Sequence, residues 1–148
     1  MGQLFQHIAC CIDDSPASDL AIAEAERLAD PDTRLSLVHV TTDPVAYPDE
    51  HGEYVADPAS GHESARRWLE RKAKSTPGAV PVLLTGHPGA SVCTWVDEVA
   101  ADLVVATAHR GFTQRVLLGS FASYLAHHSP ANVLLVRPEK ILSVPPHS

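Results

Sequence analysis

Residues 7–16 read His7-Ile8-Ala9-Cys10-Cys11-Ile12-Asp13-Asp14-Ser15-Pro16 and set the pattern for the rest of the chain. The first six residues form an apolar run of strand length, which the two acids end. The Ser15 hydroxyl can cap free backbone N–H groups, and proline suits the first helical position, so a helix is predicted to follow. A continuous apolar run, without alternation, is typical of a strand buried on both faces of a parallel sheet.

Strand and helix patterns alternate from there along the 148 residues. Further strands are predicted at 35–40, 80–85, 102–107 and 132–138, and helices at 17–28, 63–74, 90–100 and 120–128, the last capped by Ser120. The order predicts an α/β fold: a single-domain, open, five-stranded parallel sheet with helices on both faces. Pro81 indicates a sheet edge or a strand start. The domain is predicted over 1–138, with 139–148 as a C-terminal tail and 41–61 as the one long loop.

Composition and charge narrow the class of protein. Apolar residues make up 45% and charged residues 20%, as in an ordinary soluble domain. The net charge is −7, from 11 Lys and Arg against 18 Asp and Glu, which disfavours nucleic acid and anionic membranes as partners. No apolar run reaches the roughly 18 to 20 residues of a membrane-spanning helix, and residues 1–7 have no features of a secretory signal. We expect no membrane insertion and a cytoplasmic location.

The cysteines and histidines predict neither a disulfide framework nor a metal site. Cys10, Cys11 and Cys93 are odd in number and lack the short paired spacing of zinc ligands. They are interpreted as small core residues, with redox sensing by Cys10 or Cys11 as the alternative. His51 and His62 lie among acids in a polar stretch, without ligand spacing, so a solvated loop is expected there.

Parallel sheets bind ligands beyond the carboxyl ends of strands, where the strand order reverses. The candidate turns follow Ile12, Val40, Val105 and Thr85. The Asp13 carboxylate can accept hydrogen bonds from a ribose hydroxyl or an adenine amino group. Helix capping by Asp13, Asp14 or Ser15 is the alternative.

The segment 107–120 is the second candidate. It carries His109, Arg110 and Arg115, a local positive charge in an acidic chain. It ends in Gly119-Ser120 at a predicted helix start, where free N–H groups and the helix dipole attract anions. A surface loop that only caps the last helix is the alternative.

Several of these motifs together resemble the universal stress protein family, over residues 5 to about 138. The Leu117-Leu118-Gly119-Ser120 block, at its distance before the final apolar strand, is the most specific part. The other matching motifs are Asp13-x-Ser15, Val38-His39-Val40, Ala101-Asp102-Leu103-Val104-Val105, Arg115-Val116 and Val133-Leu134-Leu135-Val136.

The resemblance implies a Rossmann-like fold of the adenine nucleotide alpha hydrolase type and a homodimer joined through the strand 132–138. It also implies an adenine-nucleotide site (ATP, ADP or AMP) between the first and fourth strands, with Mg only when nucleotide is bound. Asp13, Val40, Gly119 and Ser120 match family positions. The complete set of predicted binding residues is Ile12, Asp13, Val40, Ala106, Thr107, His109, Arg110, Gly119, Ser120 and Phe121.

The chain departs from the family pattern at the phosphate loop. That pattern has Gly-x-x-Gly, nine residues, then Gly-Ser or Gly-Thr. Counting back from Gly119 places its two glycines at Ala106 and His109, and counting forward from residues 101–103 places them at Thr107 and Arg110. Asp14 also stands where a glycine is usual. A stress protein without nucleotide, acting through contacts with a client protein, is therefore the alternative function.

Enzymatic signatures are missing from the sequence. There is no nucleophile elbow, no Walker A loop and no Rossmann glycine fingerprint. Ser15 with His39 or His109 would make a dyad, but nothing in the sequence orients a base beside it. We expect a binding module with no catalytic residues, and leave slow ATP hydrolysis open.

Overall fold

The structure is a computed structural model that describes residues 4–42, 47–48, 50–52, 54–55, 58–110, 116–117 and 119–137. It confirms the predicted alternation of five main strands and four helices. In chain order the elements are β1 (His7–Cys11), α1 (Ala17–Leu28), β2 (Arg34–Thr41), β3 (Tyr47–Pro48), β4 (Tyr54–Val55), α2 (Pro58–Lys74), β5 (Ala79–Thr85), α3 (Pro88–Val99), β6 (Leu103–Thr107), β7 (His109–Arg110), β8 (Val116–Leu117), α4 (Ser120–His128) and β9 (Asn132–Val136).

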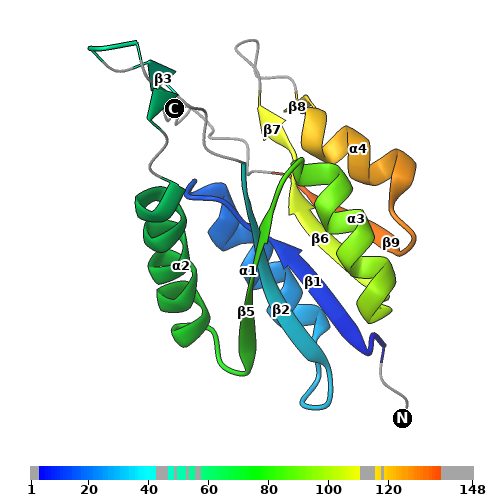
Figure 1. The fold of residues 1–148 in the computed structure, drawn as a ribbon. Helices are drawn as coiled ribbons and strands as arrows, with labels where there is room; N and C mark the ends of the chain where they lie inside the picture. The colour runs from blue at the N-terminus through cyan, green and yellow to red at the C-terminus, as the bar shows by residue number, and fades with distance from the viewer. Residues whose placement is uncertain are drawn as a thin grey trace, which may run out of the picture.

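Five strands form one parallel sheet in the order β5-β2-β1-β6-β9, a Rossmann-like arrangement (Figure 1). The chain moves outward from β1 through β2 to β5, then returns to pair β6 with β1 and continues to β9. The strand order therefore reverses between β1 and β6. Pro81 lies in β5, at one edge of the sheet, as its sequence predicts.

Helices cover both faces of the sheet (Figure 1), and the central strands β1, β2 and β6 are largely buried, which accounts for their continuous apolar runs. On one face Ile8, Cys10 and Leu37 pack with residues of α1 and α2. On the other, Cys11 and Val104 pack with residues of α3 and α4. Successive strand residues point to opposite faces, so the neighbouring cysteines belong to different halves of the core. Their prediction as core residues is confirmed, since both are buried.

Two segments predicted as loops contain further structure. Helix α2 begins at Pro58, inside the predicted loop 41–61, because proline fits a first helical turn and the following residues continue it. That segment also contains β3 and β4, which pair antiparallel, and the segment after β6 contains the antiparallel pair β7 and β8. The last strand ends at Val136, two residues before its predicted end. The tail 139–148 lies outside the described residues.

Both predicted hydroxyl caps are wrong in detail. Pro16, not Ser15, is the N-cap of α1, and the Ser15 hydroxyl donates to the Asp13 carboxylate instead. Gly119 is the N-cap of α4, and Ser120 is its first helical residue, without a side-chain cap. Each hydroxyl sits one residue from the capping position, and in α1 a nearby carboxylate is the stronger hydrogen-bond partner.

None of the described helices combines the length and apolar character that a bilayer crossing requires.

Candidate functional site

A cavity of about 210 Å³ opens at the carboxyl edge of the sheet, where the strand order reverses. Its walls come from the ends of β1, β2 and β6 and from the first turns of α3 and α4. Apolar side chains dominate, with polar groups at the rim. The lining residues are Cys11, Ile12, Asp13, Val38, His39, Val40, Pro88, Ala106, Thr107 and Phe121.

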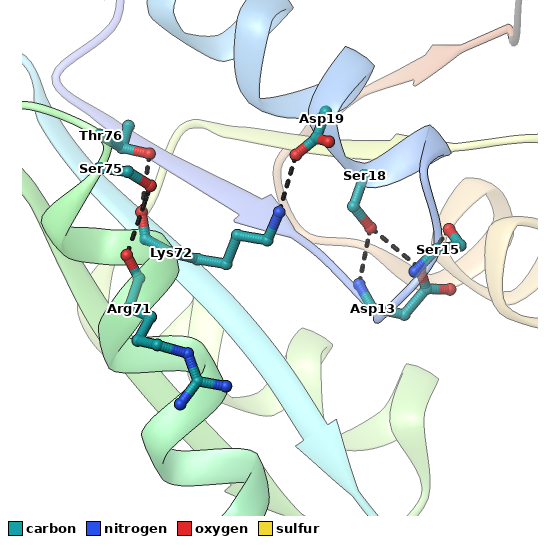
Figure 2. A network of polar contacts seen from close by, with 8 residues as sticks. All are labelled: Asp13, Ser15, Ser18, Asp19, Arg71, Lys72, Ser75 and Thr76. Carbon is teal, nitrogen blue, oxygen red and sulfur yellow. Dashed lines mark hydrogen bonds and ion pairs between the residues drawn. The ribbon is translucent and has the colours of Figure 1, made fainter.

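Asp13 is fixed at the rim by the start of α1. Its Oδ1 accepts hydrogen bonds from the Ser15 backbone N–H at 3.0 Å, from the Ser15 hydroxyl and from the Ser18 hydroxyl at 2.9 Å. The Asp13 N–H in turn donates to Ser18 Oγ at 2.8 Å, and Ser18 is only 1% exposed (Figure 2). These bonds hold the turn before α1, but no side chain caps the helix itself, so the capping alternative is wrong; Asp13 also lines the cavity.

His39 contributes from the end of β2. Its Nδ1 lies 2.8 Å from the Ile12 carbonyl oxygen, which can only accept, so Nδ1 carries the proton. The imidazole stacks edge-on against Trp68 of α2, with ring centroids 5.0 Å apart. Together these contacts tie β1, β2 and α2 around one side of the cavity. Since the Ser15 hydroxyl bonds to Asp13, the structure does not form the Ser15–His39 dyad.

Two helices, α3 and α4, begin at this edge of the sheet. The first turns of α3 and α4 carry Pro88 and Phe121, which line the cavity. Helix N-termini expose backbone N–H groups that attract anions. At α3 the His87 side chain accepts from the Ala90 N–H at 3.1 Å, whereas the N-cap of α4 is a glycine without a side-chain hydrogen bond. The start of α4 is therefore the better place for an anionic group.

Six of the ten predicted binding residues line the cavity: Ile12, Asp13, Val40, Ala106, Thr107 and Phe121. Gly119 and Ser120 lie immediately before Phe121, at the start of α4. His109 and Arg110 form β7, two residues beyond the end of β6, and their side chains lie outside the description. Nucleotide binding by these ten residues stays a prediction.

The sequence prediction missed Cys11, Val38 and Pro88 as lining residues, and it considered His39 only as a catalytic base. Cys11 is predicted as a core residue and Val38 as part of the strand 35–40. Both are buried near the carboxyl ends of β1 and β2, and both also line the cavity. Pro88 follows Thr85, one of the candidate turns, so the rule about strand ends carried the signal for it.

Four ionisable residues near or in the core have shifted pKa values that fit a structural role. Burial raises the pKa of Cys10 to about 12, and burial also raises the pKa of Cys11, which makes both thiols poor nucleophiles. At the opposite sheet edge, burial and then Arg34 lower the pKa of His7. Burial acts to raise the pKa of Asp102, but N–H donors from Gln6 and His7 outweigh it and lower that pKa. Among the described residues no three His, Cys, Asp or Glu side chains form a metal-binding group.

A sequence model described as the Universal stress protein family matches residues 4–137. Similar solved structures include the universal stress protein UspA from Lactobacillus plantarum, at 24% identity and a TM-score of 0.64, over 89% of this chain and 97% of that one. A universal stress protein in complex with cAMP matches at 24% identity and a TM-score of 0.61, over 89% of this chain and 96% of that one. A universal stress protein family protein from Arabidopsis thaliana, with AMP bound, matches at 16% identity and a TM-score of 0.61, over 90% of this chain and 92% of that one. A search of curated proteins finds no match.

Proposed function

Because this chain belongs to the universal stress protein family, we propose that it is a regulatory binding module that takes up an adenine nucleotide in the cavity between β1 and β6. The observation that carries the proposal is the cavity itself, which combines apolar walls, a fixed carboxylate at Asp13 and the uncapped start of α4. The complexes of two similar structures with cAMP and AMP support the same ligand class.

The shape of the cavity assigns parts of the nucleotide. A volume of about 210 Å³ lies below the roughly 300–1,000 Å³ of common ligand pockets, which suits a base and a sugar rather than a whole triphosphate. The apolar walls would cover the base beside Val40, and Asp13 would accept from the sugar or the adenine amino group. A phosphate would then lie at Gly119 and Ser120, where no side chain among the described residues caps the start of α4. Mg would enter only with a nucleotide that carries several phosphates.

The test adds a negative charge where the phosphate would bind. Circular dichroism would first check that Gly119→Asp keeps α4 folded, because the φ of 8° at Gly119 lies outside the extended region usual for an aspartate N-cap. The added carboxylate should repel an anion at the helix start. Gly61→Asp is the matched control, because Gly61 lies in α2 with no atom within 4 Å of an added Cβ. In titration calorimetry with AMP and ATP, Gly119→Asp should weaken binding at least tenfold and the control should not. Equal affinity of wild type and Gly119→Asp would refute the site.

A second candidate function rests on the residues at the phosphate loop. The two glycine positions of the family pattern fall on Ala106 and His109, or on Thr107 and Arg110, and none of these is glycine. Glycines there allow close approach of backbone to phosphate, and a Cβ narrows that space. If the chain binds no nucleotide, it acts through protein contacts alone. Calorimetry of the wild type separates the two candidates.

We further propose a homodimer through β9. Among the described residues, both outer strands of the sheet have an unpaired edge, but β5 contains Pro81, which lacks an N–H to donate. The β9 sequence, Asn132–Val136, has no proline and no charge, and its four apolar residues are only partly buried. Sedimentation should give about twice the 15.8 kDa chain mass; a monomer at high concentration would contradict the proposal.

Catalysis is not part of the proposed function. In this structure the Ser15 hydroxyl and the His39 Nδ1 are both occupied by neighbours, at Asp13 and at the Ile12 carbonyl. If the wild type released phosphate steadily from ATP and Gly119→Asp did not, the protein would be an enzyme instead.

A further inference from the structure

Charge is distributed unevenly over this chain. Helix α2 carries five of the 11 Lys and Arg and two of the 18 Asp and Glu, a net +3. The remaining residues therefore carry six cations against 16 acids, a net −10. One helix is basic in an otherwise acidic protein.

Three of these cations lie on the outward side of α2. Leu69 and Ala73 face the sheet and are 1% and 8% exposed. In a helix with 3.6 residues per turn, positions two before and two after Leu69 lie on the opposite side, which places Arg67 and Arg71 outward. Lys74 follows one turn later. These three exposed residues, here called the basic face, border with Glu70 a surface depression of about 180 Å³.

The charges of the basic face are poorly satisfied. Lys72, on the inner side, pairs with Asp19 of α1 at 2.9 Å, and Figure 2 shows Arg71 extending away from that pair. Arg67 lies 3.5 Å from Glu63, and both side chains are exposed. Within the described part of the chain, the Arg71 guanidinium and the Lys74 ammonium have no ion pair or hydrogen bond.

Helix stability accounts for only part of this arrangement, since Glu63 pairs with Arg67 and Glu70 lies four residues before Lys74. Cations in the last turn interact well with the helix dipole, which accounts for Lys72 and Lys74. Arg67 and Arg71, however, are four residues apart, and Arg71 and Lys74 are three apart. Like charges at these spacings repel and destabilise a helix. An anion bound across all three would relieve the repulsion.

We propose that the basic face docks an acidic segment of another protein. The face is only about 10 Å long at 1.5 Å per residue, and charges more than about 8 Å away are screened at physiological salt. A duplex with one charge per 1.7 Å, or a flat anionic membrane, would extend beyond it over the acidic remainder of the surface. A short segment with two or three carboxylates fits within it, and arginine binds carboxylates bidentately. The Glu70 carboxylate within the depression would repel a ligand with an unbroken run of negative charges, and so favours carboxylates that are spaced apart.

The probe is a fluorescein-labelled decapeptide with three glutamates separated by alanines, alongside the same peptide with glutamines. Fluorescence anisotropy would compare the wild type with two variants that lose the same charge. The variant R67Q/R71Q/K74Q removes the basic face. The control variant R27Q/R34Q/R137Q removes three exposed arginines elsewhere on the chain.

The glutamate peptide should bind the wild type, more weakly at 300 mM than at 50 mM salt, and the glutamine peptide should not. Loss of the basic face should weaken binding about tenfold, as expected for three exposed charge contacts, and the control should change it less than about twofold. Equal weakening by both variants would overturn the proposal. So would tighter, α2-dependent binding of duplex DNA or of phosphatidylserine vesicles. Nucleotide binding should be unchanged in either variant, so this proposal and the nucleotide proposal fail separately.

Discussion

Replacing Gly89 with alanine tests the helix packing that forms one wall of the cavity. Gly89 is buried in the first turn of α3, next to the lining residue Pro88. A Cβ added there would lie 2.4 Å from Tyr124 Cδ1 and 2.9 Å from Tyr124 Cβ. Rotating the ring cannot relieve the second contact, because Tyr124 Cβ is fixed to the backbone of α4. The two helices must therefore move apart.

The magnitude follows from two opposing effects. Overpacking of this kind costs about 1–3 kcal/mol, whereas alanine in place of glycine within a helix returns about 1 kcal/mol. The free energy of unfolding should therefore fall by about 1 kcal/mol, equivalent to about 2–4 °C in Tm for a chain of this size. At Gly61, where an added Cβ meets nothing within 4 Å, the same substitution should raise stability by up to about 1 kcal/mol.

Urea unfolding followed by circular dichroism would measure both variants, with Tyr124→Ala and the Gly89→Ala/Tyr124→Ala pair completing a double-mutant cycle. Once the ring is removed, Gly89→Ala should be neutral or stabilising. If Gly89→Ala raises stability as Gly61→Ala does, or if the cycle shows no coupling, the close approach of α3 and α4 is wrong.

Three further predictions concern the ionisable and polar groups. Ser18→Ala should cost about 1–3 kcal/mol in urea unfolding, because the Asp13 N–H loses its buried acceptor; a neutral effect would contradict the Asp13 network. Since burial lowers the pKa of His7, the unfolded chain takes up its proton first, so stability should fall as pH drops through about 6.5. His7→Gln should flatten the pH dependence of urea unfolding between pH 7 and 5, and an unchanged slope would remove His7 as its cause. With the pKa of Cys10 at about 12 and that of Cys11 also raised, Ellman's reagent at pH 8 should leave both thiols unreacted until the chain unfolds; rapid reaction of two thiols would contradict their burial.

The fold was predictable because burial leaves a direct mark on the sequence. A strand run such as 8–12, apolar at every position, is typical of a sheet covered on both faces, and the alternating helices supply the cover. The order of elements then located the cavity, because the ends of neighbouring parallel strands meet at one edge. This reasoning reached Ile12, Asp13 and Val40 without any knowledge of side-chain positions.

The details that escaped prediction depend on which of several neighbouring groups forms a given hydrogen bond or contact. The Ser15 hydroxyl reads as a helix cap, but Asp13 two residues away offers it a carboxylate, and Pro16 takes the capping position. The start of α2 at Pro58 was hidden in a polar stretch with no apolar periodicity. The close approach of α3 to α4 at Gly89 also escaped prediction, because the sequence marks it with nothing more than a glycine.

The most direct test of the nucleotide site is the mass of whatever accompanies the purified protein, measured by native and then denaturing mass spectrometry, with calorimetric titration of the stripped chain. We predict an additional mass of AMP, ADP or ATP, or saturable binding of one of them that Gly119→Asp abolishes. A chain that carries no such mass, and that gives no heat with AMP, ADP or ATP-Mg, would contradict nucleotide binding and leave protein contacts as its function.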